Sequence, residues 1–259
     1  MAGIVLGKKK KVRVIGRSAE KLQPLVDAGA EACVGTMEDT TFLGRAFDKV
    51  EAVFTMIPPN PRAEDFRFFQ NSVGAAIATA LVKAGVSRVV NLSSQGANLP
   101  AGTGPIAGLY DQEQRLNAVK DLKIVHLRPS YFMENLLINI GLIKNQNING
   151  TPLRGDVAFP MVATRDIALS AADYLLGNFE GRAVRDLLGQ RDLSMNVITK
   201  IIGRAIGKPD LSYVQFPYDA AEKAMVGMGL SQDIARLYIE MNRAINEGRI
   251  LTGILRTPE

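Results

Sequence analysis

Arg17 and Lys21 have the types and the spacing that could bind a phosphate group. They follow the apolar run Val12-Arg-Val-Ile-Gly16, and Ser18 between them is a residue type that caps helices. A guanidinium fork suits phosphate oxygens, and Lys21 would lie about one helical turn further on. Taken alone, the pair is more typical of a solvated helix start, so a phosphate-binding role needs support from other residues of the chain.

Few other residues have types that could do chemistry. Tyr110 is followed four residues later by Gln114, which cannot lower the pKa of a phenol as a lysine would. A structural or substrate-contact role for Tyr110 is therefore favoured over that of a catalytic acid. His126 is the only histidine and lies in an apolar run, so we expect a packed core residue and no metal site.

The composition is that of a globular chain. The 259 residues are 47% hydrophobic and 22% charged with a net charge of +5, which excludes wholesale disorder and suits one large domain or two intimate ones. Aromatic residues make up 6%, which argues against a nucleic-acid groove. Cys33 is alone and no long apolar stretch occurs, so we expect a cytoplasmic protein without a membrane partner.

The first half alternates β-rich runs with helical runs, which predicts a doubly wound α/β fold with a parallel sheet. Strands are expected at residues 11–16, 31–35, 51–57, 88–93 and 123–128, and helices at 18–29, 39–47, 63–83 and 111–119. Parallel sheets bind ligands beyond the carboxyl ends of their strands. Function should therefore concentrate just after Ile15, Gly35, Ile57, Ser93 and Arg128.

The second half is less regular and predicts a small, mostly helical cap. Helices are expected at residues 164–176, 194–206, 219–225 and 231–246, with one strand at 183–188. The expected division is a Rossmann-type domain over residues 1–135 and a substrate or cap region over 136–259.

Several motifs in order along the chain resemble the NmrA-like family of atypical short-chain dehydrogenase/reductases. They are Val12-Arg-Val-Ile-Gly-Arg17, Val34-Gly-Thr-Met-Glu-Asp39, Leu92-Ser-Ser-Gln95, Leu127-Arg-Pro-Ser-Tyr-Phe-Met-Glu-Asn135 and Val162-Ala-Thr-Arg-Asp-Ile-Ala168. The resemblance runs from about residue 8 to the end of the chain, and the motif at 127–135 is its most specific part.

The resemblance implies a dinucleotide site, with NADP(H) preferred over NAD(H). Arg17 and Lys21 would face the 2′-phosphate, since no carboxylate stands there to bind the ribose hydroxyls. The pyrophosphate and ribose would be lined by Thr55, Met56, Ile57 and Pro58. Ser93 and Ser94 would lie near the nicotinamide, and the pocket wall would be Ser130, Tyr131, Phe132 and Asn135.

One part of the family pattern has no counterpart in this sequence. The family opens with a strand and a Gly-x-x-Gly-x-x-Gly turn, whereas residues 2–6 match only the last turn of the helix that follows. We therefore expect an N-terminally truncated domain. The strands at residues 12 and 53 then either pair with each other or keep open edges, and residues 3–7 could add a short antiparallel strand.

The resemblance predicts an NAD(P)H-dependent oxidoreductase acting on a small quinone-like or imine-like substrate. The alternative is a non-catalytic NAD(P)-binding redox sensor that docks onto a regulatory protein, which the missing Tyr/Lys pair favours. A third alternative is a chain that binds no dinucleotide because it lacks the phosphate turn. No direct nucleic-acid partner is expected, and the patterns carry no signal for an oligomeric state.

Overall fold

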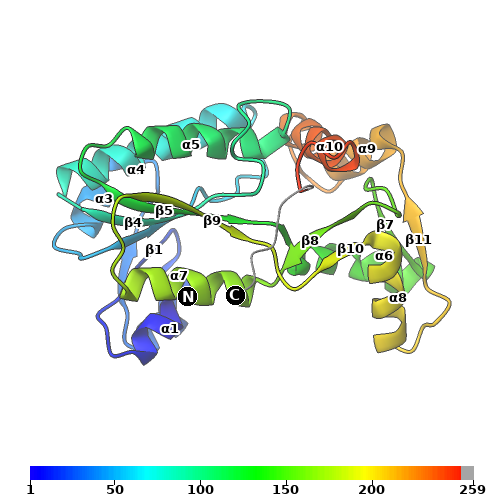
Figure 1. The fold of residues 1–259 in the computed structure, drawn as a ribbon, viewed down its shortest axis with the longest axis horizontal. Helices are drawn as coiled ribbons and strands as arrows, with labels where there is room; N and C mark the ends of the chain where they lie inside the picture. Colours follow the sequence, from blue (N-terminus) through cyan, green and yellow to red (C-terminus); the bar gives the residue numbers. More distant parts are fainter. Residues whose placement is uncertain (252–259) are drawn as a thin grey trace.

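Four parallel strands form the central sheet, in the order β3-β4-β5-β9 (Figure 1). The structure is a computed structural model and describes residues 1–251. The strands are β3 (Val53–Thr55), β4 (Arg88–Leu92), β5 (Lys123–Pro129) and β9 (Arg182–Leu187). β3, β4 and β5 are rich in buried apolar residues, as expected where helices cover both faces of a sheet.

Helices cover both faces of the central sheet (Figure 1). One face packs against α3 (Thr40–Ala46), α4 (Phe66–Lys83) and α5 (Ala107–Asn117). The other face packs against α7 (Thr164–Leu176) and Met1, which precedes α1 (Ala2–Gly7). The doubly wound α/β class predicted from the sequence is confirmed.

Helices α4 and α5 lie close together because each presents a glycine to a glutamine of the other. A Cβ atom on Gly74 of α4 would overlap the side-chain oxygen of Gln112, and one on Gly108 of α5 would overlap that of Gln70. Each glutamine lies four residues from the glycine on its own helix, so the arrangement is reciprocal. This close contact fixes α5 over the sheet.

Strands β1 (Arg13–Gly16) and β2 (Glu31–Val34) form a separate parallel sheet covered by α2 (Ala19–Asp27). Within residues 1–251, β1 pairs only with β2 and β3 pairs only with β4, so the edge of each that is not paired stays open. Ser18 caps α2 as predicted, accepting a hydrogen bond from the Lys21 backbone N–H at 3.3 Å.

The N-terminal residues form a helix, and the short antiparallel strand that we considered for residues 3–7 is wrong. The helical spacing lets Ala2 and Leu6 face the same side, where both pack against the cluster of Val14, Leu22 and Ala30. Met1 packs against the other cluster, beside Ala171 of α7. Burial of these side chains favours the helix over an exposed strand.

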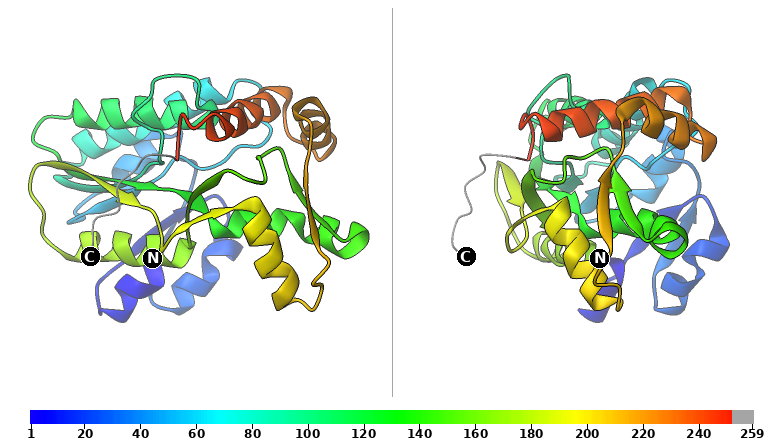
Figure 2. Two further views of the ribbon diagram at one scale, coloured as in Figure 1. Left: turned by 45° about the vertical axis from the view of Figure 1, so that its right-hand side comes forward. Right: turned by 90° about the vertical axis from the view of Figure 1, so that its right-hand side faces the viewer.

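The second half forms a smaller module beside the central sheet (Figure 2). Its strands are β6 (Tyr131–Phe132), β7 (Ile148–Thr151), β8 (Ala158–Val162), β10 (Asp192–Ser194) and β11 (Ser212–Gln215). Its helices are η2 (Met133–Asn139), α6 (Ile140–Gln146), α8 (Met195–Ala205), α9 (Tyr218–Gly227) and α10 (Gln232–Asn246). The short helix η1 (Gly104–Ile106) leads into α5 and lies against α10.

The predicted helices of this half are present, whereas the five short strands of this module were not predicted. Each spans two to five residues, too short to show a clear hydrophobic period. The segment with α7 and β9 returns to the central sheet, where β9 pairs with β5. The division at residues 135 and 136 therefore stays a prediction, and residues 164–187 belong structurally with the first half.

Candidate active site

The carboxyl ends of β3, β4 and β5 meet at one edge of the central sheet. They bring Thr55, Ser93 and Ser130 together, because Thr55 pairs in register with Asn91 and Asn91 with His126. The edge therefore gathers most of the predicted site residues. Arg17 and Lys21 instead follow β1, at the carboxyl end of the separate β1–β2 sheet.

A buried chain of hydrogen bonds crosses the three strands just before this edge. The Thr55 hydroxyl donates to Asn91 Oδ1 at 3.0 Å, and Asn91 Nδ2 lies 3.1 Å from His126 Nδ1. His126 Nε2 lies 3.1 Å from Asn117 Oδ1 of α5. Because an amide NH₂ only donates and an amide oxygen only accepts, His126 is the neutral tautomer with its proton on Nε2.

This chain defines what Thr55 and His126 can do. Burial lowers the pKa of His126, which outweighs the opposing effect of Glu113. His126 is 1% exposed and has partners on both ring nitrogens, as expected for a packed residue. The Thr55 hydroxyl is turned into the protein, whereas Met56 is exposed and Ile57 and Pro58 are half-buried.

A buried carboxylate, Glu113 of α5, joins the ends of β4 and β5. Its Oε1 accepts from the Ser93 hydroxyl at 2.5 Å and from Arg128 Nε at 2.9 Å, and its Oε2 accepts from the second Arg128 nitrogen at 2.5 Å. Glu113 is 2% exposed and the Arg128 side chain 18%. Hydrogen bonding to Glu113 raises the pKa of Arg128 despite its burial.

An apolar pocket lies on the α7 side of the same edge. It is lined by Met1, Phe54, Leu92, Phe132, Thr164, Ile167, Ala168 and Ala171, and holds about 160 Å³. A cavity of about 150 Å³ with similar lining accommodates benzene. The pocket therefore has room for one flat ring and is too small for a whole dinucleotide.

The motif at residues 130–135 contributes different groups to this region. The Ser130 hydroxyl is buried without a hydrogen-bond partner, and Phe132 lines the apolar pocket. Tyr131 packs against Phe159, with ring centroids 5.3 Å apart, and burial raises its pKa to about 12. Its phenol therefore stays protonated at neutral pH, while Asn135 is exposed.

Glu134 of this motif caps α7. Its carboxylate accepts from the Thr164 backbone N–H at 3.0 Å and from the Thr164 hydroxyl at 2.6 Å. Burial opposes ionisation here, but the hydrogen bonds from Thr164 win and lower the pKa of Glu134. Glu134 therefore connects the strand-end motif to the helix that lines the pocket.

The two predicted phosphate-binding residues are exposed. Arg17 precedes the cap residue of α2 and Lys21 lies in the first turn of that helix. Neither side chain has a hydrogen-bond or ion-pair partner in the described part of the chain, so both charges are available to a ligand.

The described residues include groups that suit the two ends of a dinucleotide, but they lack the glycine-rich turn that usually binds its pyrophosphate. The free charges at Arg17 and Lys21 suit a 2′-phosphate, and the unpartnered Ser130 hydroxyl and the apolar pocket suit the opposite end. Within residues 1–251, no glycine-rich turn precedes β1, and no strand pairs with the open edge of β1 or of β3.

Helix α5 does not carry the Tyr/Lys pair of classical short-chain dehydrogenases. Tyr110 is half-buried, and Gln114 at the position of the lysine is exposed. The side chain that α5 extends toward the strand ends is Glu113, one turn after Tyr110. No cluster of potential metal ligands occurs among the described residues.

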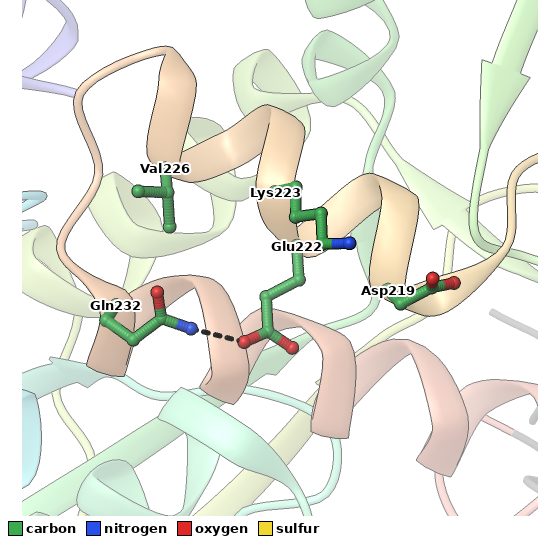
Figure 3. Close-up of a pocket in the computed structure, with 5 residues that line it drawn as sticks. All are labelled: Asp219, Glu222, Lys223, Val226 and Gln232. Atoms are coloured by element: carbon green, nitrogen blue, oxygen red, sulfur yellow. Dashed lines mark hydrogen bonds between the residues drawn. The ribbon is translucent and has the colours of Figure 1, made fainter.

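A wider groove lies away from these strand ends, between α9 and α10 (Figure 3). It is lined by Asp219, Glu222, Lys223, Val226 and Gln232, and Gln232 donates to Glu222 at 2.5 Å. These side chains are mostly solvated and include no buried polar group without a partner, so nothing in the groove indicates a ligand or a reaction. Within residues 1–251, no helix is long and apolar enough to span a membrane.

The model of the NmrA-like family matches residues 1–252 of the 259. The chain belongs to the NmrA-like family. It is 26% identical to the NAD(P)H azoreductase of Xenophilus azovorans over 95% of this chain and 82% of that protein. It is 29% identical to a (4-alkanoyl-5-oxo-2,5-dihydrofuran-3-yl)methyl phosphate reductase of Streptomyces griseus, over 83% of this chain and 72% of that protein.

Solved structures share the fold of this NmrA-like chain. The Citrobacter sp. triphenylmethane reductase complexed with NADP(H) superposes with a TM-score of 0.81 at 18% identity, over 98% of this chain and 88% of that one. The NADPH complex of quinone oxidoreductase QOR2 from Escherichia coli gives 0.79 at 19% identity, over 95% and 85%. At this level of identity the likeness shows the Rossmann-type fold alone.

Several residues of the site were missed from the sequence of this NmrA-like protein. Asn91, Glu113 and Asn117 form its buried hydrogen bonds, yet each looks like an ordinary polar residue of a strand or helix. Glu134 lay within the quoted motif, but its capping role depends on Thr164, which is 30 residues away. Only the position of Glu134 in the motif could have drawn attention to it.

Proposed function

We propose that this NmrA-like chain is an NAD(P)H-dependent oxidoreductase that reduces a small organic substrate. The observation that carries the proposal is the ring-sized apolar pocket at the carboxyl ends of β3 and β4, which is also lined by Phe132 of the motif at residues 127–135. Open parallel sheets bind ligands at this edge. Two curated relatives bear the names of reductases, one of them a reductase that uses NAD(P)H, which supports the same activity here.

The proposed cofactor is NADP(H) in preference to NAD(H). Arg17 and Lys21 would bind the 2′-phosphate through charge-assisted hydrogen bonds. Met56, Ile57 and Pro58 would line the pyrophosphate and ribose, with Thr55 supporting them from inside the protein. The supporting observation is that both basic side chains are exposed and lack partners among the described residues.

The bound cofactor would supply the hydride, and the chain would supply placement and a dry environment. Phe132 and Phe54 would hold a flat ring in the apolar pocket and exclude water from it. The Ser130 hydroxyl would satisfy a polar group at the rim of that ring, together with Asn135, and the protonated Tyr131 would complete the wall. Ser93 would support the wall from below, because its proton is held by Glu113.

The proposed substrate class is quinone-like or imine-like. Such molecules are flat and conjugated and accept a hydride without covalent attachment to the protein, so placement alone can accelerate the reaction. This suits a site whose α5 helix has Gln114 in place of a lysine.

A calorimetric titration of the chain with NADPH and NADH, followed by NADPH oxidation with 1,4-naphthoquinone as acceptor, tests the proposal. Micromolar binding with NADPH preferred, together with turnover, is expected. Binding without turnover of either a quinone or an imine acceptor would favour the redox-sensor alternative, for which the missing Tyr/Lys pair is the supporting observation. Absence of binding would contradict both.

A further inference from the structure

The ion pair between Glu113 and Arg128 lies at the carboxyl ends of β4 and β5, the crevice of the proposed site, and its carboxylate is almost completely buried. Glu113 is 2% exposed, and all three of its hydrogen bonds come from the ends of β4 and β5. A buried ion pair loses its hydration, and apolar replacements of similar size are often as stable. Stability alone is therefore a weak reason for this pair to be here.

The two strand ends do not need Glu113 to stay together. The backbone N–H of Ser93 donates to the Leu127 carbonyl at 2.7 Å, and that of Gln95 donates to the Pro129 carbonyl at 3.0 Å. These bonds continue the ladder between β4 and β5 past the end of β4. Glu113 adds a connection from α5 to both strand ends.

That connection helps to hold α5 above the crevice, together with the close α4–α5 contact and the hydrogen bond between Asn117 and His126. Tyr110 lies one turn before Glu113, and Ser130 lies two residues after Arg128 on the strand that leads into the pocket wall. A shift of α5 would therefore move Tyr110 relative to the Ser130 hydroxyl and Phe132. Within the described residues, α5 makes one other side-chain hydrogen bond to the central sheet, from Asn117 to His126, and this bond lies before the strand ends.

We infer that Glu113 is a positioning residue of the reaction, acting through Ser93 and Arg128 to hold α5 and the pocket wall in the geometry that turnover requires. This inference rests on the proposed function. It assigns to Glu113 a supporting role on α5 that differs from the proton transfer of a Tyr/Lys pair, because Glu113 touches neither cofactor nor substrate. Two nitrogens of Arg128 donate to the Glu113 carboxylate, and the Ser93 hydroxyl is turned inward to donate to it as well.

The same helix supplies a matched control. Asp111, two residues before Glu113, forms a two-point ion pair with Arg67 of α4, with oxygen to nitrogen distances of 2.6 and 2.8 Å. That pair is partly exposed and faces α4, away from the strand ends. Asp111→Asn therefore removes a comparable contact from α5 without touching the crevice.

The experiment compares kcat and KM for NADPH, with 1,4-naphthoquinone as acceptor, in the unmodified chain, Glu113→Gln, the double variant Glu113→Leu with Arg128→Met, and Asp111→Asn. We expect both Glu113 variants to lose about tenfold to a hundredfold in kcat, the scale that misplacement in an active site produces. KM for NADPH should stay within about threefold, because Arg17 and Lys21 lie on the other sheet, remote from Glu113. Asp111→Asn should retain its kcat.

The double variant keeps the test decisive even if Glu113→Gln fails to fold, because it leaves no buried charge unpaired. Unchanged kcat in a folded double variant would overturn the inference, as would an equal loss in Asp111→Asn. A loss that follows the melting temperature across the set would assign Glu113 a structural role and also overturn it. Absence of turnover in the unmodified chain would overturn the proposed function itself, and the inference with it.

Discussion

The central sheet and the β1–β2 sheet present different chemistry at their carboxyl ends. At the central sheet, Glu113 accepts hydrogen bonds from both Ser93 and Arg128, and the three side chains are largely shielded from solvent. At the β1–β2 sheet, Arg17 and Lys21 are exposed and lack side-chain partners among the described residues. The side chains of the first arrangement are held by hydrogen bonds and shielded from water, whereas those of the second are solvated and free to change rotamer.

The difference separates two tasks that a dinucleotide-dependent reductase must perform. Exposed charges attract a phosphate at long range and tolerate small errors in its position. A hydride transfer requires reacting atoms at nearly fixed distances, which only a pre-formed and packed wall provides. Under the proposed function, the phosphate would be recognised at one sheet and the reacting groups positioned at the other.

The largest expected contrast is in stability. Arg128→Met leaves Glu113 as a buried, unpaired carboxylate and should lower the free energy of unfolding by about 3–5 kcal/mol. Arg17→Met, at the matching place on the other sheet, should change it by no more than about 0.5 kcal/mol. Urea denaturation measures both. Adding Glu113→Leu to Arg128→Met should recover most of the loss, and equal effects at the two arginines would contradict the contrast.

Hydrogen exchange should sharpen the comparison. The inner strands β4 and β5 are paired on both sides, whereas β1 has one partner and one open edge. We expect backbone amides of β1 and β2 to exchange at least about a hundredfold faster than those of β4 and β5, since regions with few packed contacts open locally. Mass spectrometry of peptides from the two sheets measures this. Equal protection would mean that the two sheets open as one unit.

Cofactor discrimination is the third test, on the β1–β2 side. Arg17→Met should weaken NADPH binding about tenfold, near the lower end of the 1.5–3 kcal/mol typical of a charged hydrogen bond, because the side chain is exposed. NADH binding should not change, since NADH has no 2′-phosphate. Calorimetry measures both constants. Lys8→Met removes a lysine outside the proposed site and is the control, and equal losses for both cofactors would contradict the assignment.

The sequence was sufficient to predict the strands and helices that carry a clear hydrophobic pattern. Each strand of the central sheet was placed within two or three residues, because buried β-branched runs ended by Gly or Pro are local signals. Short strands such as β6 and β10 were missed, since two or three residues carry no period. For the facing edges of β1 and β3 two outcomes were expected, pairing with each other or open edges, and the structure has the second.

The site was harder to predict than the fold, for a physical reason. Arg17 could be named because it directly follows β1, and Phe132 because it lies in the motif at residues 127–135. The partnership of Glu113 with Ser93 joins residues 20 apart on different elements, and its strength comes from burial that only packing creates. His126 was correctly expected in the core, but its role between Asn91 and Asn117 depends on strand register, which a single sequence does not specify.

The smallest expected effect concerns pH and the buried hydrogen-bond chain of the central sheet. Burial lowers the pKa of His126, so below about pH 6.5 the unfolded chain binds a proton that the folded chain does not. Folding stability should therefore fall as the pH drops from about 7 to 5, with a contribution of at most about 1.4 kcal/mol per pH unit. Protonation of Nδ1 would also remove the acceptor for Asn91.

His126→Gln isolates this contribution because it removes the only histidine while keeping a neutral polar side chain. Carboxylates titrate in both proteins, so their effects cancel in the difference between the two stability profiles. Urea denaturation at a series of pH values should show a stability difference that does not depend on pH above about pH 7 and changes below it, where only the unmodified chain loses the contribution of His126. A constant difference, or one that grows toward alkaline pH, would mean that His126 does not stay neutral between Asn91 and Asn117. The central sheet would then lack the fixed polarity that distinguishes it from the β1–β2 sheet.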